Sequence, residues 1–484
     1  MQNENSIKKN VLYNTLLSIS QFIFPLVTFP YVSRILGPAG IGEVSFVDSM
    51  TQYFILFAAL GIPVYGVREI AKRKNDQEGL TKLYAELISI HFFLTLILSL
   101  VYIALFNFIP KLHTKAGLFW IGTAVLIINV FPAEWFFQGI EQFSYIVKRT
   151  LIIRILSVGL IFLMIRSPED SLWYYSINFI TFLLNSVINI SYILRHLKIK
   201  FSGLELKHHL KPLLLIFSGN VAISVYILMD SIILGLMGSN AEVGYYTTCV
   251  RFNRLSLSLL SAFSLVMLPR LSVAFNNRDN DKARSLLKES FEYIMFLSIP
   301  ICVGVYVLAP DIIYLFAGSA FDPSITVLRI TSPLIVFIGL SNIFGMQMLI
   351  PTGKEMILLK AVSIGTVMSI ILNLVLIPIY KHNGTAVTSV LTELTVTLLT
   401  GYFALREFRF NMSSRIIIYA IIASLTFFPI ASLISLWQLN PYMRFISIVA
   451  FSGLSYFSVQ YFVFRNHLVV KILSIGKTYL KNKF

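Results

Sequence analysis

The sequence predicts an all-α, polytopic membrane protein with fourteen transmembrane helices, arranged as two six-helix lobes followed by two C-terminal helices. Of its 484 residues, 56% are hydrophobic and only 13% are charged, and the mean hydropathy is +0.78. This composition is typical of a membrane protein rather than a soluble domain. The apolar residues fall into runs of about 20, the length that crosses a bilayer as a helix. Lys and Arg lie between the runs, and most of them fall in alternate loops.

The order of the spans defines four predicted regions. The N-terminal lobe, residues 1–200, has spans centred near Ile23, Tyr53, Thr95, Ile127, Leu156 and Leu183. The C-terminal lobe, residues 201–408, has spans centred near Val225, Leu257, Ile299, Phe337, Ile370 and Val396. Two further spans, centred near Thr426 and Tyr456, occupy residues 409–464. Residues 465–484 alternate Val and Leu with Lys, which predicts a basic amphipathic helix on the anionic inner leaflet; a solvated, frayed tail is the alternative.

The distribution of basic residues indicates the orientation of the chain. With an even number of spans both termini face the same side, and the loops on that side hold most of the 39 Lys and Arg. The opposite loops hold only Arg34, Lys111, Lys115, Arg166, Lys381 and Arg444. The positive-inside rule therefore places both termini in the cytoplasm. Because the basic residues are dispersed between spans, the net charge of +16 reflects membrane topology and does not predict a nucleic-acid-binding face.

Several stretches of the two lobes resemble each other. Gly42 pairs with Gly244 and Arg68 with Arg270 at the same spacing, and residues 136–143 match residues 350–357 at a slightly longer one. Each repeat has six spans, an even number, so both copies keep the same orientation in the membrane. The sequence therefore predicts a parallel repeat about an axis along the membrane normal, which suits alternating access between the lobes.

The sequence carries no signature of a soluble enzyme. It has no Walker A loop, no HExxH motif and no cysteine pair at metal-binding spacing. We therefore expect no enzyme activity, no metal and no cofactor, and any active transport would draw on an ion gradient, the membrane potential or consumption of the substrate on the far side. A membrane-embedded glycosyltransferase, polymerase or ligase is the enzyme alternative, but the predicted outside loops are too short for the catalytic loops of such enzymes.

Four carboxylates inside predicted spans are candidates for ion coupling: Asp48, Glu134, Asp230 and Glu393. A charge at this depth is costly and is expected to face a protein-lined interior. Each carboxylate could bind a proton or a sodium ion, which relieves the cost of burying a bare negative charge. The alternative is a structural role, such as an ion pair with an arginine or a bond to backbone at a helix break, and it is strongest for Glu134, which lies beside Pro132.

Arginines are the candidates for binding an anionic substrate. Arg251 and Arg254 are three residues apart and so share one helix face, with Arg251 roughly 10 Å below the outer surface at about 1.5 Å per residue. A pair of guanidinium groups suits phosphate oxygens, although neutralising Asp230 is the alternative. Arg68 and Arg270 end their spans at the cytoplasmic side, where they could attract an anion or simply anchor the helices.

Several motifs resemble those of a known family. They are SRILGPAGIGEVSF, GIPVYGVREIAK, AEWFFQGIEQ, MDSIILGLMGSNAEVGYY and MLPRLS, in that order. Together they resemble the polysaccharide-export flippases, the O-antigen and repeat-unit translocases of the multidrug/oligosaccharidyl-lipid/polysaccharide exporter superfamily. The resemblance covers the first twelve predicted spans and is most specific in AEWFFQG and MDSIILG.

The resemblance implies a V-shaped cleft between the two lobes, lined largely by the first, second, seventh and eighth spans. It implies flipping of an undecaprenyl-diphosphate-linked oligosaccharide across a bacterial inner membrane. Lipid-linked oligosaccharide, membrane lipids, a polysaccharide polymerase and a chain-length regulator are the implied partners. A cation-coupled multidrug antiporter of the same superfamily remains the alternative.

Overall fold

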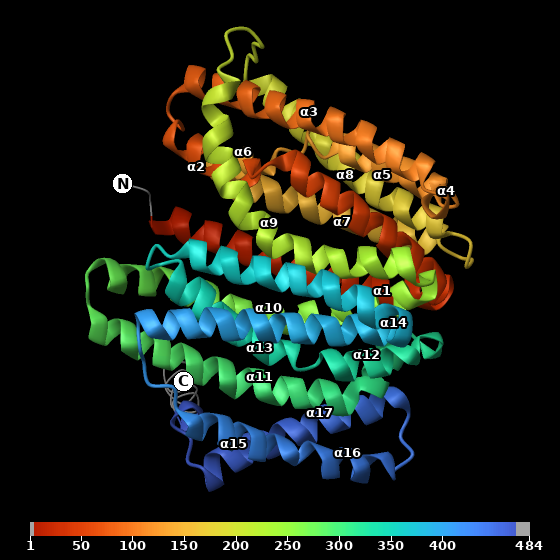
Figure 1. Ribbon diagram of the computed structural model, residues 1–484, viewed down its shortest axis with the longest axis vertical. Helices are drawn as coiled ribbons and strands as arrows, with labels where there is room; N and C mark the ends of the chain where they lie inside the picture. Colours follow the sequence, from red (N-terminus) through yellow and green to blue (C-terminus); the bar gives the residue numbers. More distant parts are fainter. Residues whose placement is uncertain (1–3, 471–484) are drawn as a thin grey trace. The chain divides into compact units, whose positions relative to one another are not determined.

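The computed structural model describes residues 4–470, with side chains except those of residues 4–19, 21–22, 218–227, 259 and 265. Within this range every regular element is a helix (Figure 1), which confirms the prediction of an all-α protein. The chain forms two compact units, Met1–Gly244 and Tyr245–Phe484. The predicted lobe boundary near residue 200 stays a prediction. Most of the predicted amphipathic tail, residues 471–484, lies outside the described residues.

The first unit is built around a long N-terminal element. Its helices are α1 (Glu4–Ala59), α2 (Ile62–Lys72), α3 (Gln77–Phe108), α4 (Pro110–His113), α5 (Ala116–Ile128), α6 (Glu134–Gly139), α7 (Phe143–Met164), α8 (Ser171–His196), α9 (Leu206–Met237) and the first turn of α10 (Asn240–Asn276). The backbone of α1 leaves helical geometry at Gly37, where φ is 64°, so α1 consists of two helices joined across a kink. Glycine tolerates this conformation because it has no Cβ atom. α1 packs against α7 and α9, while α3, α5 and α8 lie side by side (Figure 1).

Small residues bring α2 and α6 into close contact in this unit. A Cβ atom on Gly66 would lie 2.5 Å from the ring of Trp135, and one on Gly139 would lie 2.5 Å from the side chain of Ile70. Trp135 and Ile70 belong to a buried hydrophobic cluster that also includes Tyr84 of α3. The AEWFFQG motif therefore forms a packed helix pair with the PVYGVREIAK segment.

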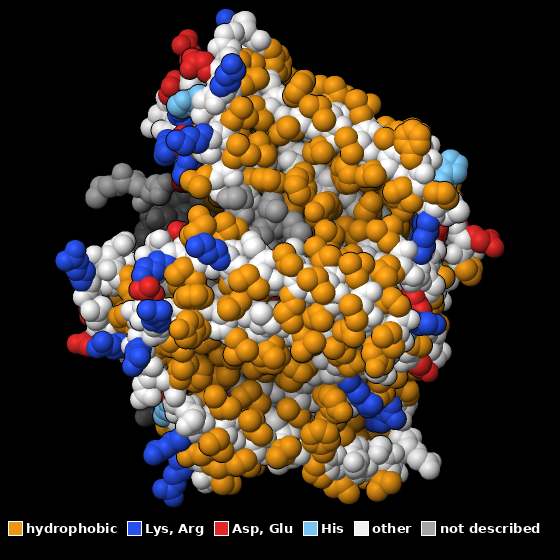
Figure 2. Space-filling view, viewed as in Figure 1, with side chains coloured by type: hydrophobic (Ala, Val, Ile, Leu, Met, Phe, Trp, Pro, Cys, Tyr) orange, Lys and Arg blue, Asp and Glu red, His pale blue; other side chains and the backbone are white. Residues whose placement is uncertain are grey.

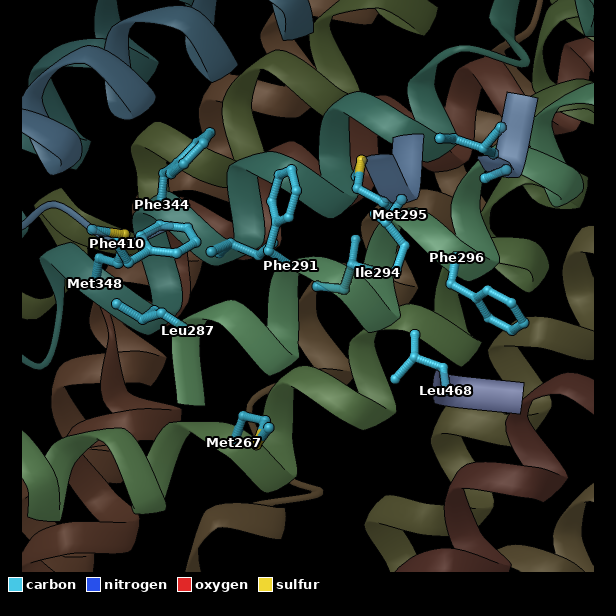
Figure 3. Packing of buried hydrophobic residues seen from close by; sticks show 14 of the residues in the cluster. Met267, Leu287, Phe291, Ile294, Met295, Phe296, Phe344, Met348, Phe410 and Leu468 are labelled. Carbon is cyan, nitrogen blue, oxygen red and sulfur yellow. The ribbon is translucent and has the colours of Figure 1, made fainter. Parts of the chain in front are cut away.

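The second unit contains the remaining helices. They are the rest of α10, α11 (Asn280–Phe316), α12 (Pro323–Thr331), α13 (Leu334–Asn342), α14 (Glu355–Glu407), α15 (Ser414–Leu425), α16 (Phe427–Ser435) and α17 (Pro441–Ser458). A short 3-10 helix, Ser319–Phe321, and two π-helices, Ile343–Leu349 and Val459–Val463, connect or extend them. α14 is also two helices joined across a kink, at Lys381. Figure 3 shows the core of this unit, where Phe291, Ile294 and Met295 of α11 lie among buried side chains that include Phe344 and Met348.

The outer faces of both units are apolar. Nine helices of the described part are long and apolar enough to cross a membrane, and α1 and α14 each contribute one long apolar stretch that a kink divides. Hydrophobic side chains cover the helix faces, whereas Lys and Arg gather toward the helix ends (Figure 2). Phe93, Leu163 and Ile379 are 63%, 65% and 66% exposed. Water would not favour so many exposed apolar side chains, so these faces meet lipid, and the chain is a multi-pass membrane protein.

Candidate functional site

Two of the predicted intramembrane carboxylates, Asp48 and Asp230, lie on helices that pack against each other, α1 and α9. The helices touch at Phe46 and Gly235, where an added Cβ atom on the glycine would lie 2.0 Å from the phenylalanine ring. Asp48 lies about 3 Å along its helix from this contact and Asp230 about 7 Å, both away from the turn between α9 and α10, at about 1.5 Å per residue. Asp230 is buried, and Asp48 is half-buried and accepts a 3.5 Å hydrogen bond from Gln52. The structure therefore brings both carboxylates to a similar depth on neighbouring helices.

The two glycines that the sequence repeat pairs, Gly42 and Gly244, lie at one close contact in the first unit. A Cβ atom on Gly42 would lie 1.7 Å from the carbonyl oxygen of Asn240 and 2.6 Å from the nitrogen of Gly244. A Cβ atom on Gly244 would lie 2.0 Å from the carbonyl oxygen of Pro38. Backbone meets backbone here, so the beginning of α10 packs on α1 without an intervening side chain.

Two lysines from the predicted outside loops hold the turn between α9 and α10. Lys111 Nζ donates hydrogen bonds to the carbonyl oxygens of Leu236 (2.9 Å) and Gly238 (2.8 Å). These carbonyls lie at the C-terminal end of α9, where a cation also interacts favourably with the helix dipole. Lys115 Nζ donates to Asn240 Oδ1. Lys115 is buried, and burial lowers the pKa of its ammonium group.

Glu134 lies at the centre of a polar network. It begins α6, directly after Ala133, whose φ of 38° breaks the chain away from α5. Arg149 Nη2 of α7 donates to Glu134 Oε1 at 2.6 Å, and Arg149 Nη1 donates to Asn189 Oδ1 of α8. Asn189 Nδ2 donates in turn to the carbonyl oxygen of Pro132. The arginine pairing that the sequence left open for Glu134 is thus formed, and it ties α6, α7 and α8 together.

A cavity of about 320 Å³ adjoins this network. Its lining includes Glu134, Trp135, Gln138, His91 and Asn185. Among the described residues, His91 Nδ1 and Asn185 Oδ1 are buried and have no hydrogen-bond partner. The cavity therefore has polar groups in a partly apolar lining, has room for several water molecules, and gives the exposed Glu134 carboxylate a wet surface inside the unit.

Arg68, predicted as an anion-attracting residue, forms an ion pair on its own helix. Its Nε atom lies 3.2 Å from Glu69 Oε1, and Lys72 and Arg73 bind the same carboxylate at 2.8 Å and 2.9 Å. The geometry of this cluster favours anchoring of α2, although the Arg68 side chain stays exposed. Its predicted repeat partner, Arg270, is exposed on α10.

Arg251 and Arg254 lie on a face of α10 that is turned away from α12. Asn253 Nδ2 donates to Thr331 Oγ1 of α12 at 2.9 Å, and Cys249 lies one turn earlier on the same face. At about 100° per residue, the two arginines lie about 100° to 160° around the helix from Asn253 and about 60° from each other. Arg251 is half-buried and Arg254 exposed. In the same unit Glu393 is buried on the second half of α14.

Arg149, Asn189 and Lys115 are polar groups of these sites that the sequence did not single out. Arg149 lies two turns into α7, only 3% exposed in its side chain, although its position suggests a cytoplasmic loop. A basic residue close after an intramembrane glutamate is the signal that could have found it. Lys115 resembles an ordinary loop lysine in the sequence, and no local pattern reveals its partner on α10.

Comparison with known proteins gives consistent matches. The family model described as "Polysaccharide biosynthesis protein" matches residues 7–275, and the model of lipid II flippase MurJ matches residues 155–451. A protein of Escherichia coli (strain K12) named "Putative O-antigen transporter" is 24% identical over 404 residues, covering 83% of this chain and 97% of that protein.

Solved structures share the fold. An inward closed conformation of lipid II flippase MurJ has a TM-score of 0.74 at 18% identity, covering 95% of this chain and 100% of that chain. An inward-facing multidrug resistance MATE family transporter of the MOP superfamily has a TM-score of 0.62 at 16% identity, covering 80% and 94%. The fold is therefore that of MurJ-like and MATE-like transporters.

Proposed function

Because this chain belongs to the polysaccharide biosynthesis protein family, a family of membrane transporters and not of enzymes, we propose that it is a flippase for a lipid-linked oligosaccharide. The proposed substrate is an undecaprenyl-diphosphate-linked repeat unit of O-antigen, capsule or exopolysaccharide. It moves from the inner to the outer leaflet of a bacterial inner membrane by alternating access. The names of the E. coli relative and of MurJ support this proposal.

We propose a topology of fourteen spans with both termini in the cytoplasm. The kinks at Gly37 and Lys381 support it, because each divides one long helical element into two membrane-length helices. The predicted regions 1–200, 201–408 and 409–464 then hold six, six and two spans. α5, α7 and α9 complete the count: α5 is shorter than the others, and the Lys and Arg residues of α7 make it less apolar.

The observation that carries the substrate proposal is the arginine face of α10. Arg251 and Arg254 lie within a membrane-length helix and are turned away from the face that packs on α12. Two guanidinium groups about 60° apart on one helix suit the oxygens of a diphosphate or of acidic sugars, which accept paired hydrogen bonds. Arg68 and Arg270, at the basic helix ends, would attract the same anion from the cytoplasm. The MATE-like fold keeps open the alternative of a multidrug antiporter for cations. The four arginines disfavour this alternative, because they would repel a cationic drug.

The test of the arginine assignment is the double variant R251A/R254A in the native host. We expect lipid-linked oligosaccharide to accumulate on the cytoplasmic leaflet, measured by leaflet-selective labelling, with loss of surface polysaccharide and normal amounts of the protein in the membrane. R251K/R254K should restore little, because lysine keeps the charge but lacks the planar, bidentate donor group. Arg329→Ala is the matched control, since this arginine of α12 lies against Tyr306 of α11. Normal export by the double alanine variant would contradict the assignment, and a changed sensitivity to cationic drugs on gene deletion would favour the antiporter.

Coupling to protons or sodium ions is proposed for the four intramembrane carboxylates. Asp48 and Asp230 lie at similar depth on packed helices, the exposed Glu134 adjoins a cavity with polar groups in its lining, and Glu393 is buried. Neutralising Asp230 to Asn should reduce flipping driven by an ion gradient and leave the protein folded. A polysaccharide polymerase and a chain-length regulator are proposed partners, since such enzymes consume the flipped repeat unit.

A further inference from the structure

A cluster of buried titratable side chains lies in the first unit, apart from the residues discussed so far. Tyr65 of α2, Glu86 of α3 and His209 of α9 are 3%, 4% and 3% exposed. Tyr65 Oη and His209 Nδ1 share a hydrogen bond of 2.8 Å, and His209 Nε2 and Glu86 Oε2 share another of 2.8 Å. Both nitrogens of the imidazole therefore have a partner, and the two bonds connect three helices.

Glu86 also holds the beginning of α9. Its second oxygen, Oε1, accepts a hydrogen bond of 2.9 Å from the backbone N–H of Glu205, the residue that precedes α9. A carboxylate at this end of a helix interacts favourably with the helix dipole. Lys82, one turn before Glu86, binds Glu205 Oε1 at 2.7 Å. One buried carboxylate on α3 thus uses both oxygens to fix the first turns of α9.

The donors and acceptors of the cluster define two protonation states. An ionised carboxylate only accepts, so His209 Nε2 carries a hydrogen, and in the neutral ring Nδ1 must then accept the hydrogen of Tyr65 Oη. One added proton places a hydrogen on Nδ1 as well. The ring then becomes a cation that donates to the Glu86 carboxylate and to Tyr65 Oη. The hydrogen bond between α9 and α3, which already carries the charge of the carboxylate, then becomes an ion pair between two charged groups.

Other charged groups lie near the cluster, and one of them, Lys82, has its Nζ atom 3.9 Å from Glu86 Oε1. They are Arg68, Glu69 and Arg73 on α2, Lys82 on α3, and Glu205 and His208 at the beginning of α9. Glu69 binds its arginine neighbours, and Lys82 binds Glu205. Within the cluster itself, the one imidazole is that of His209.

We propose that Tyr65, Glu86 and His209 form a proton-binding latch at the basic end of the first unit. With the proton bound, the beginning of α9 is tied to α3 by an ion pair; when the proton leaves, the tie weakens and α9 moves more easily. α9 also carries Asp230, so the pH at this end of the molecule sets the mobility of a helix that bears a proposed coupling carboxylate. The latch itself rests on the hydrogen-bond geometry of the three side chains, and only its effect on transport rests on the proposed flippase function.

The latch is tested by hydrogen exchange of the purified, full-length protein in detergent, followed by mass spectrometry at about pH 5.5 and about pH 8, the range over which imidazoles titrate. For peptides covering residues 204–213, corrected for intrinsic exchange rates, we expect protection to be about fivefold higher at the lower pH, because the hydrogen bond to the carboxylate gains a second charge. His209→Asn should bring this ratio close to one. His208→Asn is the matched control, because the neighbouring histidine is exposed, and it should keep the wild-type ratio.

Glu86→Gln provides an independent check that also serves if His209→Asn fails to fold. It keeps the shape, and its amide oxygen can still accept from the backbone N–H of Glu205, while its NH2 group can only donate to His209 Nε2 in the other neutral tautomer. The negative partner is removed, so protection should no longer increase in acid. A wild-type protein without pH-dependent protection, or a His209→Asn variant with the wild-type ratio, would overturn the proposal.

The effect on transport is measured separately, as the rate of glycolipid flipping in vesicles at the same two pH values. We expect the wild type and His208→Asn to be slower at the lower pH and His209→Asn to be equally fast at both. If flipping occurs with the same pH profile in wild type and His209→Asn, the latch has no role in transport and the proposal is wrong. If no flipping occurs at any pH while the exchange pattern holds, the proposed function fails and the latch stands.

Discussion

Gly42→Ala tests the closest backbone contact of the first unit. The new Cβ atom would lie 1.7 Å from the carbonyl oxygen of Asn240, and non-bonded heavy atoms prefer a separation of about 3.5 Å, so α1 and the start of α10 must separate by about 2 Å. Overpacking costs about 1–3 kcal/mol where side chains can shift, and here the obstacle is backbone, so we expect about 3 kcal/mol. The same displacement weakens the Lys115–Asn240 hydrogen bond, which adds about 1 kcal/mol.

The assay is thermal unfolding of the purified protein in detergent, with Gly159→Ala as the matched control. Gly159 also lies inside a helix, α7, but a Cβ atom there would meet nothing within 4 Å. We expect Gly159→Ala to be neutral or stabilising by up to about 1 kcal/mol, since alanine favours helix, and Gly42→Ala to melt at least about 5 °C lower. Gly244→Ala approaches the same contact from α10 and should behave like Gly42→Ala. Equal melting of Gly42→Ala and Gly159→Ala would refute the reasoning.

Two further predictions concern charged groups at helix ends. Asp170 accepts hydrogen bonds from the backbone N–H groups of Arg166 (2.8 Å) and Ser167 (2.7 Å), which lower the pKa of its carboxyl group. The ionised Asp170 carboxylate therefore stabilises the loop before α8 fully above the ordinary pKa of an aspartate, and this stabilisation is lost as the pH falls through the lower pKa of the folded state. Hydrogen exchange should show the loss as weaker protection of the Arg166 and Ser167 amides in acid. Asp170→Ala should weaken the protection of these amides already at neutral pH. Arg444 of α17 donates to the buried Asp311 of α11 at 2.6 Å. Arg444→Met leaves this carboxylate unpaired and should lower the free energy of unfolding by about 3 kcal/mol. Adding Asp311→Asn to this variant removes the unpaired charge and should recover most of the melting temperature. Equal melting temperatures of the single and double variants would contradict this reasoning.

The helical, membrane-spanning character of the chain could be read from its sequence because hydropathy is a local property. The breaks within the two longest helices lie where the sequence analysis places loops. The break at Gly37 follows Arg34, and Lys381, the site of the second break, was itself assigned to an outside loop. The conformation at each break was harder to predict, because Lys381 takes a positive φ without a glycine.

The candidate site was predictable only as a set of costly charges. Intramembrane position singled out Glu134, but its partner, Arg149, follows a helix break at Ala133, and the sequence does not fix the direction in which the chain continues. The cluster around His209 escaped prediction for a similar reason. Its members come from three helices, and hydropathy alone does not define which faces of those helices meet.

The contacts that Lys111 and Lys115 make at the turn between α9 and α10 affect how the topology of this protein can be mapped. Membrane-impermeant amine reagents report which lysines face the outside, and the predicted outer loop before α5 offers two of them, Lys111 and Lys115. Lys111 is exposed in the structure, whereas Lys115 is buried and hydrogen-bonded to Asn240. An experiment that relied on Lys115 would find it unlabelled and assign this segment to the membrane or the cytoplasm. His113 lies in the same loop and is exposed, so a cysteine introduced at this position reports on the loop without being shielded as Lys115 is.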